Sequence, residues 1–107
     1  MAVDVRAEGR AGALKALAEP VRWQILERLA AEELCVCHLV DDLGVAQPLV
    51  SHHLKVLRQA GLVESDRFRQ WVYYRLSPGA VAAVAGELLG MARSAGTAAG
   101  SRRPCCR

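Results

Sequence analysis

Cysteines are the residues of this 107-residue chain whose chemistry is most specific. Cys35 and Cys37 are separated by one valine, and Cys105 and Cys106 are adjacent near the C-terminus. The first residues contain no apolar stretch typical of a secretion signal, so we expect a cytoplasmic protein with reduced thiols. In that setting four cysteines indicate metal binding or redox chemistry before structural disulfides.

Each cysteine pair also has a simpler interpretation. A cysteine in a small core often serves as a compact hydrophobe, and Cys35 falls near the apolar face of its predicted helix. Cys37 falls on the polar side of that helix, which argues against the same role. The C-terminal pair is alternatively an incidental part of a tail, although the neighbouring Arg102, Arg103 and Arg107 favour thiolates.

The elements that position these cysteines follow from hydrophobic periodicity. Apolar residues recur at helical spacing and predict helices over residues 13–18, 20–31, 35–43, 47–60 and 78–93. The residues up to about Gly12 are expected to fray. Gly44 and Gly61 end the third and fourth helices, and the tight turn after Gly44 makes these two helices a helix-turn-helix.

A change of period after Gly61 predicts a β-hairpin. Leu62 and Val63 begin one strand, residues 71–76 form the other, and residues 65–70 form a polar tip. The fold class is therefore mainly α with a small β-hairpin (α+β), a winged helix-turn-helix. We expect one DNA-binding and dimerisation domain over residues 1–93 and a flexible tail over residues 94–107.

The helix over residues 47–60 carries a face suited to reading DNA. Val50, Leu54 and Leu57 share its core side, while hydroxyl, imidazole, ammonium and amide groups lie opposite, and such groups bind base edges and phosphates. The hairpin tip adds groups that could reach flanking DNA. An ordinary solvated surface is the alternative for both, and His53 is better interpreted as a packed histidine. The predicted DNA-contacting residues are Gln47, Pro48, Ser51, His52, Lys55, Gln59, Arg67, Arg69 and Gln70.

Four segments together resemble the ArsR/SmtB family of metal-sensing repressors. They are LKALAEPVRWQILERL, ELCVCHL, LGVAQPLVSHHLKVLRQAGLV and RQWVYYRL, in this order over residues 13–77. The resemblance implies a homodimer that binds double-stranded operator DNA and releases it when metal binds. The first and last helices would form the interface, in agreement with an apolar stripe of Val81, Val84, Leu88 and Met91 that Leu14 and Leu17 can cover.

The resemblance also indicates the inducer. Cys35-Val-Cys37 is similar to the start of the motif in arsenic and cadmium/lead sensors, but the third cysteine of the arsenic version is replaced by Val40. Because As(III) prefers three thiolates, we expect Cys105 or Cys106 to supply the third, with His38 as a non-thiol alternative. As(III), or the similar Sb(III), is the expected inducer. A cadmium/lead-responsive repressor and a thiol-based metal carrier without a DNA role are the alternatives.

The cysteine spacing suggests how a metal could act. Side chains two positions apart on a helix point in directions about 200° apart, so one ion binding Cys35 and Cys37 should distort the start of that helix. The distortion would displace Ser51, His52 and Lys55 on the next helix. The helix over 78–93 has no His, Asp or Cys, which excludes the zinc site that some relatives build there.

Other function classes find little support. An arsenate reductase of the phosphatase-like type needs an Arg six residues after its Cys, where this chain has Asp41 and Leu43. No Gly-rich phosphate loop or acid/base cluster is visible, so we expect no enzymatic activity. No apolar run approaches the length that crosses a membrane. The net charge of +3 is compatible with a nucleic acid partner but does not establish one.

Overall fold

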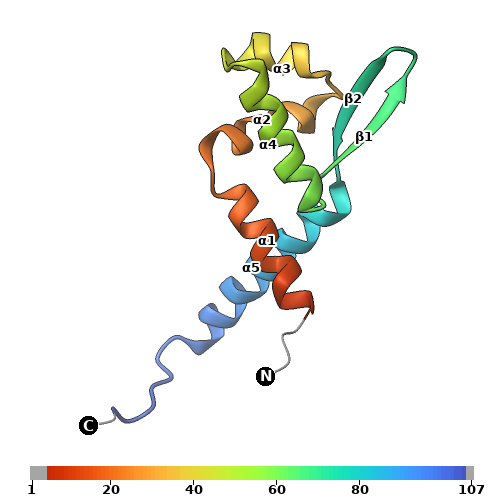
Figure 1. Cartoon of the computed structure of the whole chain (residues 1–107). Helices are drawn as coiled ribbons and strands as arrows, with labels where there is room; N and C mark the ends of the chain where they lie inside the picture. The colour runs from red at the N-terminus through yellow and green to blue at the C-terminus, as the bar shows by residue number, and fades with distance from the viewer. Residues whose placement is uncertain (1–4, 106–107) are drawn as a thin grey trace.

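The described part of the chain forms five helices and one hairpin, as the sequence predicts (Figure 1). The computed structural model describes residues 5–105, with side chains described from Ala11 onward. In chain order the elements are α1 (Val5–Leu17), α2 (Pro20–Ala31), α3 (Val36–Leu43), α4 (Gln47–Gln59), β1 (Val63–Phe68), β2 (Trp71–Leu76) and α5 (Pro78–Ala98).

Local sequence explains most of the boundaries. Proline occupies the first turn of α2, α4 and α5, where its missing N–H removes no helical hydrogen bond. Gly44 ends α3 with φ at 65°, a left-handed conformation that glycine adopts without steric cost. Gly61 takes a similar conformation after α4, with φ at 78°. These two glycines fix the turns on either side of α4.

Three helices have boundaries that differ from the sequence predictions. α1 begins at Val5 and not at Ala13, so residues expected to fray are helical. α3 begins at Val36, and Cys35 is its N-cap residue in an extended conformation. α5 continues through Arg93 to Ala98, across the predicted boundary between domain and tail. Alanine and glycine dominate the ends of α1 and α5, and they give no periodic signal from which a helix end can be predicted.

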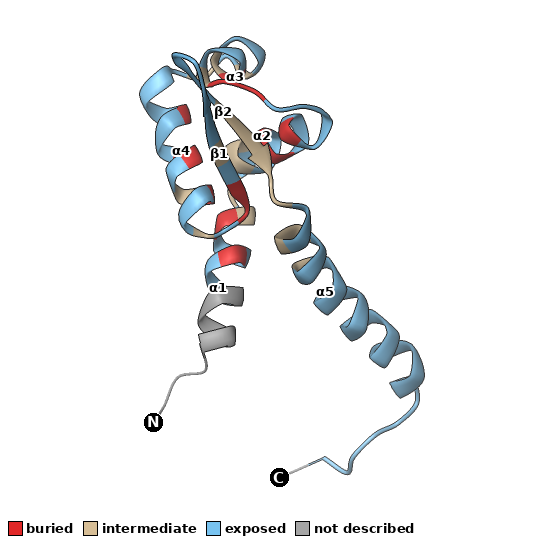
Figure 2. Ribbon diagram, turned by 90° about the vertical axis from the view of Figure 1, so that its right-hand side faces the viewer, coloured by how far each residue is buried: buried red, intermediate tan, exposed pale blue. Residues whose placement is uncertain are grey.

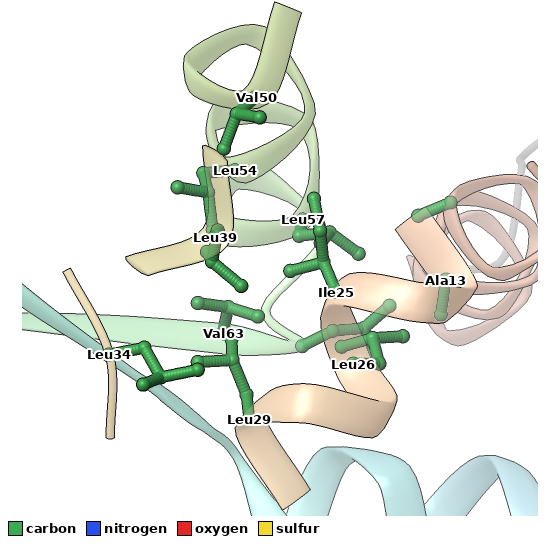
Figure 3. Close-up of a cluster of buried hydrophobic side chains, with 12 residues drawn as sticks. Ala13, Ile25, Leu26, Leu29, Leu34, Leu39, Val50, Leu54, Leu57 and Val63 are labelled. Carbon is green, nitrogen blue, oxygen red and sulfur yellow. The ribbon is translucent and has the colours of Figure 1, made fainter. Parts of the chain in front are cut away.

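The core lies where α2, α3, α4 and β1 meet. Ile25 and Leu39 are fully buried, and Leu54 and Leu57 of α4 pack in the same cluster (Figure 3). Burying side chains of this size contributes about 1.5–3 kcal/mol each relative to leaving them in water. This packing fixes α4 by one face and leaves its other face in solvent.

The hairpin pairs β1 with β2 in antiparallel register, from Val63 opposite Leu76 to Phe68 opposite Trp71. β1 is longer than predicted, because it includes residues 65–68 and only Arg69 and Gln70 form the turn, whereas β2 has the predicted bounds. We call this hairpin, residues 63–76, the wing. Leu34 forms a single antiparallel bridge with Tyr74 on the free edge of β2, so the segment before α3 is tied to the wing.

α5 leaves the rest of the molecule and contains no buried residue (Figure 2). Its contacts with the remainder of the chain include those with α1. Among the described residues, no helix combines the length and apolar character needed to cross a membrane.

Candidate nucleic-acid interface and thiol site

The outer face of α4 presents every polar group that the sequence assigned to it. Val50, Leu54 and Leu57 hold the helix to the core, with exposed fractions of 1% or less. The opposite side is open to solvent along the whole helix, and Arg58 near its end lies 3.4 Å from the Ser65 hydroxyl of β1. We call this exposed set the recognition face: Gln47, Pro48, Ser51, His52, Lys55 and Gln59.

His53 is packed, as predicted, and takes no part in the recognition face. Its side chain is buried, with Nδ1 3.4 Å from Arg22 Nη1 and 3.8 Å from Glu19 Oε2. Burial lowers the pKa of His53 below its usual 6.5, and the positive charges of Arg22 and His52 act in the same direction against the raising effect of Glu19. His53 is therefore a neutral structural group at neutral pH.

The charges of the wing are partly neutralised. Arg75 binds Glu64 at 2.8 Å and also pairs with Asp66, so these two carboxylates are compensated within the hairpin. Arg67 and Arg69 are exposed and have no acidic partner among the described residues. Arg69 lies in the turn with φ at 59°, and its guanidinium is 5.5 Å from the centre of the Phe68 ring. The positive charge of the wing is thus concentrated at its tip, beside Gln70.

Cys35 is buried and caps the first turn of α3. Its backbone N–H donates to Nδ1 of His38 at 3.0 Å, and its side chain faces the backbone N–H of His38, which completes a capping box. The His38 imidazole is held by this box through one nitrogen.

Cys37 lies in the first turn of α3 with its side chain in solvent. Both cysteines affect the pKa of one tyrosine of the wing. The negative charge of Cys35 raises the pKa of Tyr73 above its usual 10.0, as do burial, a hydrogen bond with the Cys35 side chain and the charge of Cys37. Tyr73 is thus a neighbour of the thiol pair that the sequence analysis missed. The signal is non-local, since it depends on the pairing of Leu34 with Tyr74.

Cys105 is not brought to this pair. Cys105 is exposed, and the end of α5 and α3 lie at opposite ends of the molecule in Figure 1. Cys106 lies outside the described residues. Within residues 5–105, no group of three His, Cys, Asp or Glu side chains is arranged to hold a metal ion. A three-thiolate site would therefore need a rearrangement or a second chain.

Known proteins share this arrangement. The family model for bacterial regulatory proteins of the arsR family matches residues 19–65, which include α2, α3 and α4. The structure of NolR from Sinorhizobium fredii superposes with a TM-score of 0.68 at 35% identity, over 85% of this chain and 95% of that chain. The chain belongs to the arsR family.

Two curated relatives of this arsR-family chain are named as repressors, not as enzymes. The HTH-type transcriptional repressor SmtB of Mycobacterium tuberculosis is 52% identical over 64 residues, 60% of this chain and 47% of that protein. The arsenical resistance operon repressor of Escherichia coli is 45% identical over 65 residues, 60% of this chain and 56% of that protein. The chain spans about half the length of these relatives.

Proposed function

We propose that this chain is a transcriptional repressor that releases its operator DNA when the Cys35 and Cys37 thiolates bind As(III). The proposal rests on the position of the thiol pair relative to the recognition face. The thiol pair stands at the start of α3, and α3 packs directly on α4, whose free side is the recognition face. Any ligand that moves the start of α3 also moves the groups that would read DNA.

DNA binding rests on the shape and charge of α4 and the wing. A helix held by one face can enter the major groove with the other, where hydroxyl, imidazole and amide groups distinguish base pairs. Lys55 and the two arginines near the wing tip supply positive charge for phosphates. Two copies of the chain, related by a two-fold axis, would read two half-sites of a palindromic operator.

Release follows from the geometry of the thiol pair. Cys35 points inward from the N-cap, whereas Cys37 points to solvent one residue into the helix. An ion that binds both sulfurs would compete with the His38 backbone N–H for the Cys35 sulfur, and it would thereby weaken the capping box at the first turn of α3. Metal and DNA thus favour different arrangements of α3, and each weakens binding of the other by the same factor.

A second protomer is the best source of the third thiolate. Residues 99–105, which follow α5, reach at most about 25 Å when fully extended, and α5 leads away from α3 (Figure 1). We infer that Cys105 or Cys106 of a dimer partner completes the site. The alternative third ligand is His38, whose second ring nitrogen is not used by the capping box.

The experiment is operator binding, followed by fluorescence anisotropy, with and without arsenite. Cys35→Ser and Cys37→Ser should bind operator like the wild type but no longer release it when arsenite is added. The Cys105→Ser/Cys106→Ser double variant should lose sensitivity to arsenite and keep its affinity for phenyl-substituted arsenic, which takes only two thiolates. His38→Ala tests the alternative ligand.

Three results would contradict the proposal. Normal arsenite release by both Cys35→Ser and Cys37→Ser would exclude the thiol pair as the sensor. Release by Cd(II) or Pb(II) but not by arsenite would favour a cadmium/lead-responsive repressor. Metal binding without any operator binding would favour a thiol-based carrier.

A further inference from the structure

The segment before α3 is paired with the wing like a short third strand. Leu34 N–H donates to the Tyr74 carbonyl at 3.1 Å, and Tyr74 N–H donates to the Leu34 carbonyl at 2.8 Å. Such reciprocal bonds mark a hydrogen-bonded pair of an antiparallel ladder. The next pair is Cys35 opposite Tyr73, because Cys35 still has an extended backbone with φ −85° and ψ 165°. Side chains of such a pair share a face and approach closely.

Tyr73 is therefore held between two partners on one face of the sheet. On one side its register partner is Asp66 of β1, and on the other side is Cys35. The ring is half-buried, while Cys35 is buried behind it with an exposed fraction of 5%. An open hollow of about 610 Å³ lies next to the ring, lined by Glu33, Asp66, Arg67, Phe68 and Tyr73.

We propose that Tyr73 is a positioning residue of the thiol site: its hydroxyl donates a hydrogen bond to the Cys35 sulfur and makes the wing respond when that sulfur binds a ligand. The role in the response rests on the proposed function of Cys35, whereas the contact with the sulfur does not.

The consequence is a second connection between thiols and DNA. An ion on Cys35 takes the sulfur lone pairs that accept from the phenol and opens the capping box, so Tyr73 loses its partner. Tyr73 and Tyr74 are adjacent in β2, and β2 is paired with β1 along its whole length. A shift at this point is transmitted to Arg67 and to the wing tip. This connection is separate from the packing of α3 on α4.

The contact is tested without metal or DNA. A full-length protein with Cys37→Ser, Cys105→Ser and Cys106→Ser retains Cys35 alone, and its reaction with dithiodipyridine, a small neutral disulfide, reports thiolate reactivity. Adding Tyr73→Phe removes only the hydroxyl and should slow the reaction about threefold to tenfold, because the Cys35 sulfur loses a hydrogen-bond donor that favours its reactive form. The sulfur without this donor is intrinsically more nucleophilic, but this effect offsets only part of the decrease in rate. Tyr74→Phe is the matched control and should react like the parent. An equal or faster rate for Tyr73→Phe overturns the proposal.

The response of the wing is tested by fluorescence. Trp23 and Trp71 are the two tryptophans of the chain, and Trp71 is half-exposed near the wing tip. In a Trp23→Phe protein, arsenite should change the Trp71 emission, Tyr73→Phe should reduce that change at least twofold, and Tyr74→Phe should preserve it. A full response in Tyr73→Phe overturns the coupling. Failure of the parent protein to bind arsenite contradicts the proposed function instead, and the disulfide reaction still decides the assignment of Tyr73.

Discussion

Individual side chains of the recognition face differ in what they can contact. Ser51 and His52 are adjacent and short, so their polar atoms stay close to the helix and reach base edges only when the helix enters the groove. Lys55 is one turn further along with a long flexible stem, which suits a phosphate. Arg69 at the wing tip is the corresponding group on the other element. We therefore expect Ser51 and His52 to contribute sequence specificity, and Lys55 and Arg69 to neutralise phosphate charge.

We expect this division to appear in salt titrations. Lys55→Ala and Arg69→Ala should weaken binding to all sequences and lower the slope of log affinity against log salt by about one each. Ser51→Ala and His52→Ala should leave the slope unchanged and reduce the preference for operator over random DNA, by about 1–3 kcal/mol where a base contact is lost. Arg28→Ala, on the exposed side of α2, is the charge-matched control. Wild-type affinity in all four variants would exclude the recognition face.

At the scale of elements, a polar cluster holds the junction of α1, α2 and α4 together. Glu19 caps α2 by accepting from Arg22 N–H at 2.8 Å, and the Arg22 guanidinium donates to the Ala16 carbonyl at the end of α1 at 2.9 Å. His53 of α4 lies close to Arg22 and Glu19, so it connects α4 to this cluster. A buried imidazole beside an arginine is stable only without a proton, so this junction is sensitive to acid.

Stability should fall as the pH drops through the His53 titration. The pKa of His53 is lowered in the folded state, chiefly by burial, so the unfolded chain binds the proton first, near pH 6.5. The stabilising contribution is therefore complete above about pH 6.5 and is lost progressively below it. Urea denaturation at about pH 7.5 and about pH 5 should show this loss. The loss should shrink in His53→Gln and persist in His52→Gln, and equal losses in both variants would contradict the assignment.

The sequence predicts elements better than it predicts their neighbours. Apolar spacing located α2 and α4, and glycine located the turns, because these signals are local. The wheel argument for Cys35 and Cys37 assumed that both lie in a helix, and it was wrong for Cys35 because an N-cap residue has an extended backbone. The approach of Tyr73 to Cys35 depends on pairing between distant segments, which no local pattern reveals.

The whole molecule is more extended than a compact chain of its length. Its radius of gyration is 18.0 Å, whereas about 13 Å is expected for a compact domain of this size. The difference comes from α5, a long helix without a buried residue. Leu88 and Met91 are 54% and 63% exposed, and both line a small apolar groove with Leu14 and Val84. An exposed apolar surface of this kind is typical of a contact site, and we expect a second copy of the chain to cover it.

We predict a homodimer through α1 and α5. Sedimentation equilibrium at micromolar concentration should give about twice the monomer mass of 11.6 kDa. Leu88→Glu places a charge in the proposed interface and should yield monomers that bind operator at least tenfold more weakly, because two half-sites are no longer engaged together. Gln24→Glu on the exposed side of α2 adds the same charge away from these helices and from the wing, and it is the control. A wild-type monomer at this concentration would contradict the prediction.

The turn of the wing shows a conflict between backbone preference and charge. Arg69 has a positive φ, a conformation that glycine and asparagine adopt at a lower energetic cost than arginine. If position 69 were randomised and the library selected for folding alone, we expect glycine and asparagine to be recovered. A parallel selection for operator binding should instead recover arginine and lysine. The residues recovered at this one position would then distinguish selection for folding from selection for operator binding.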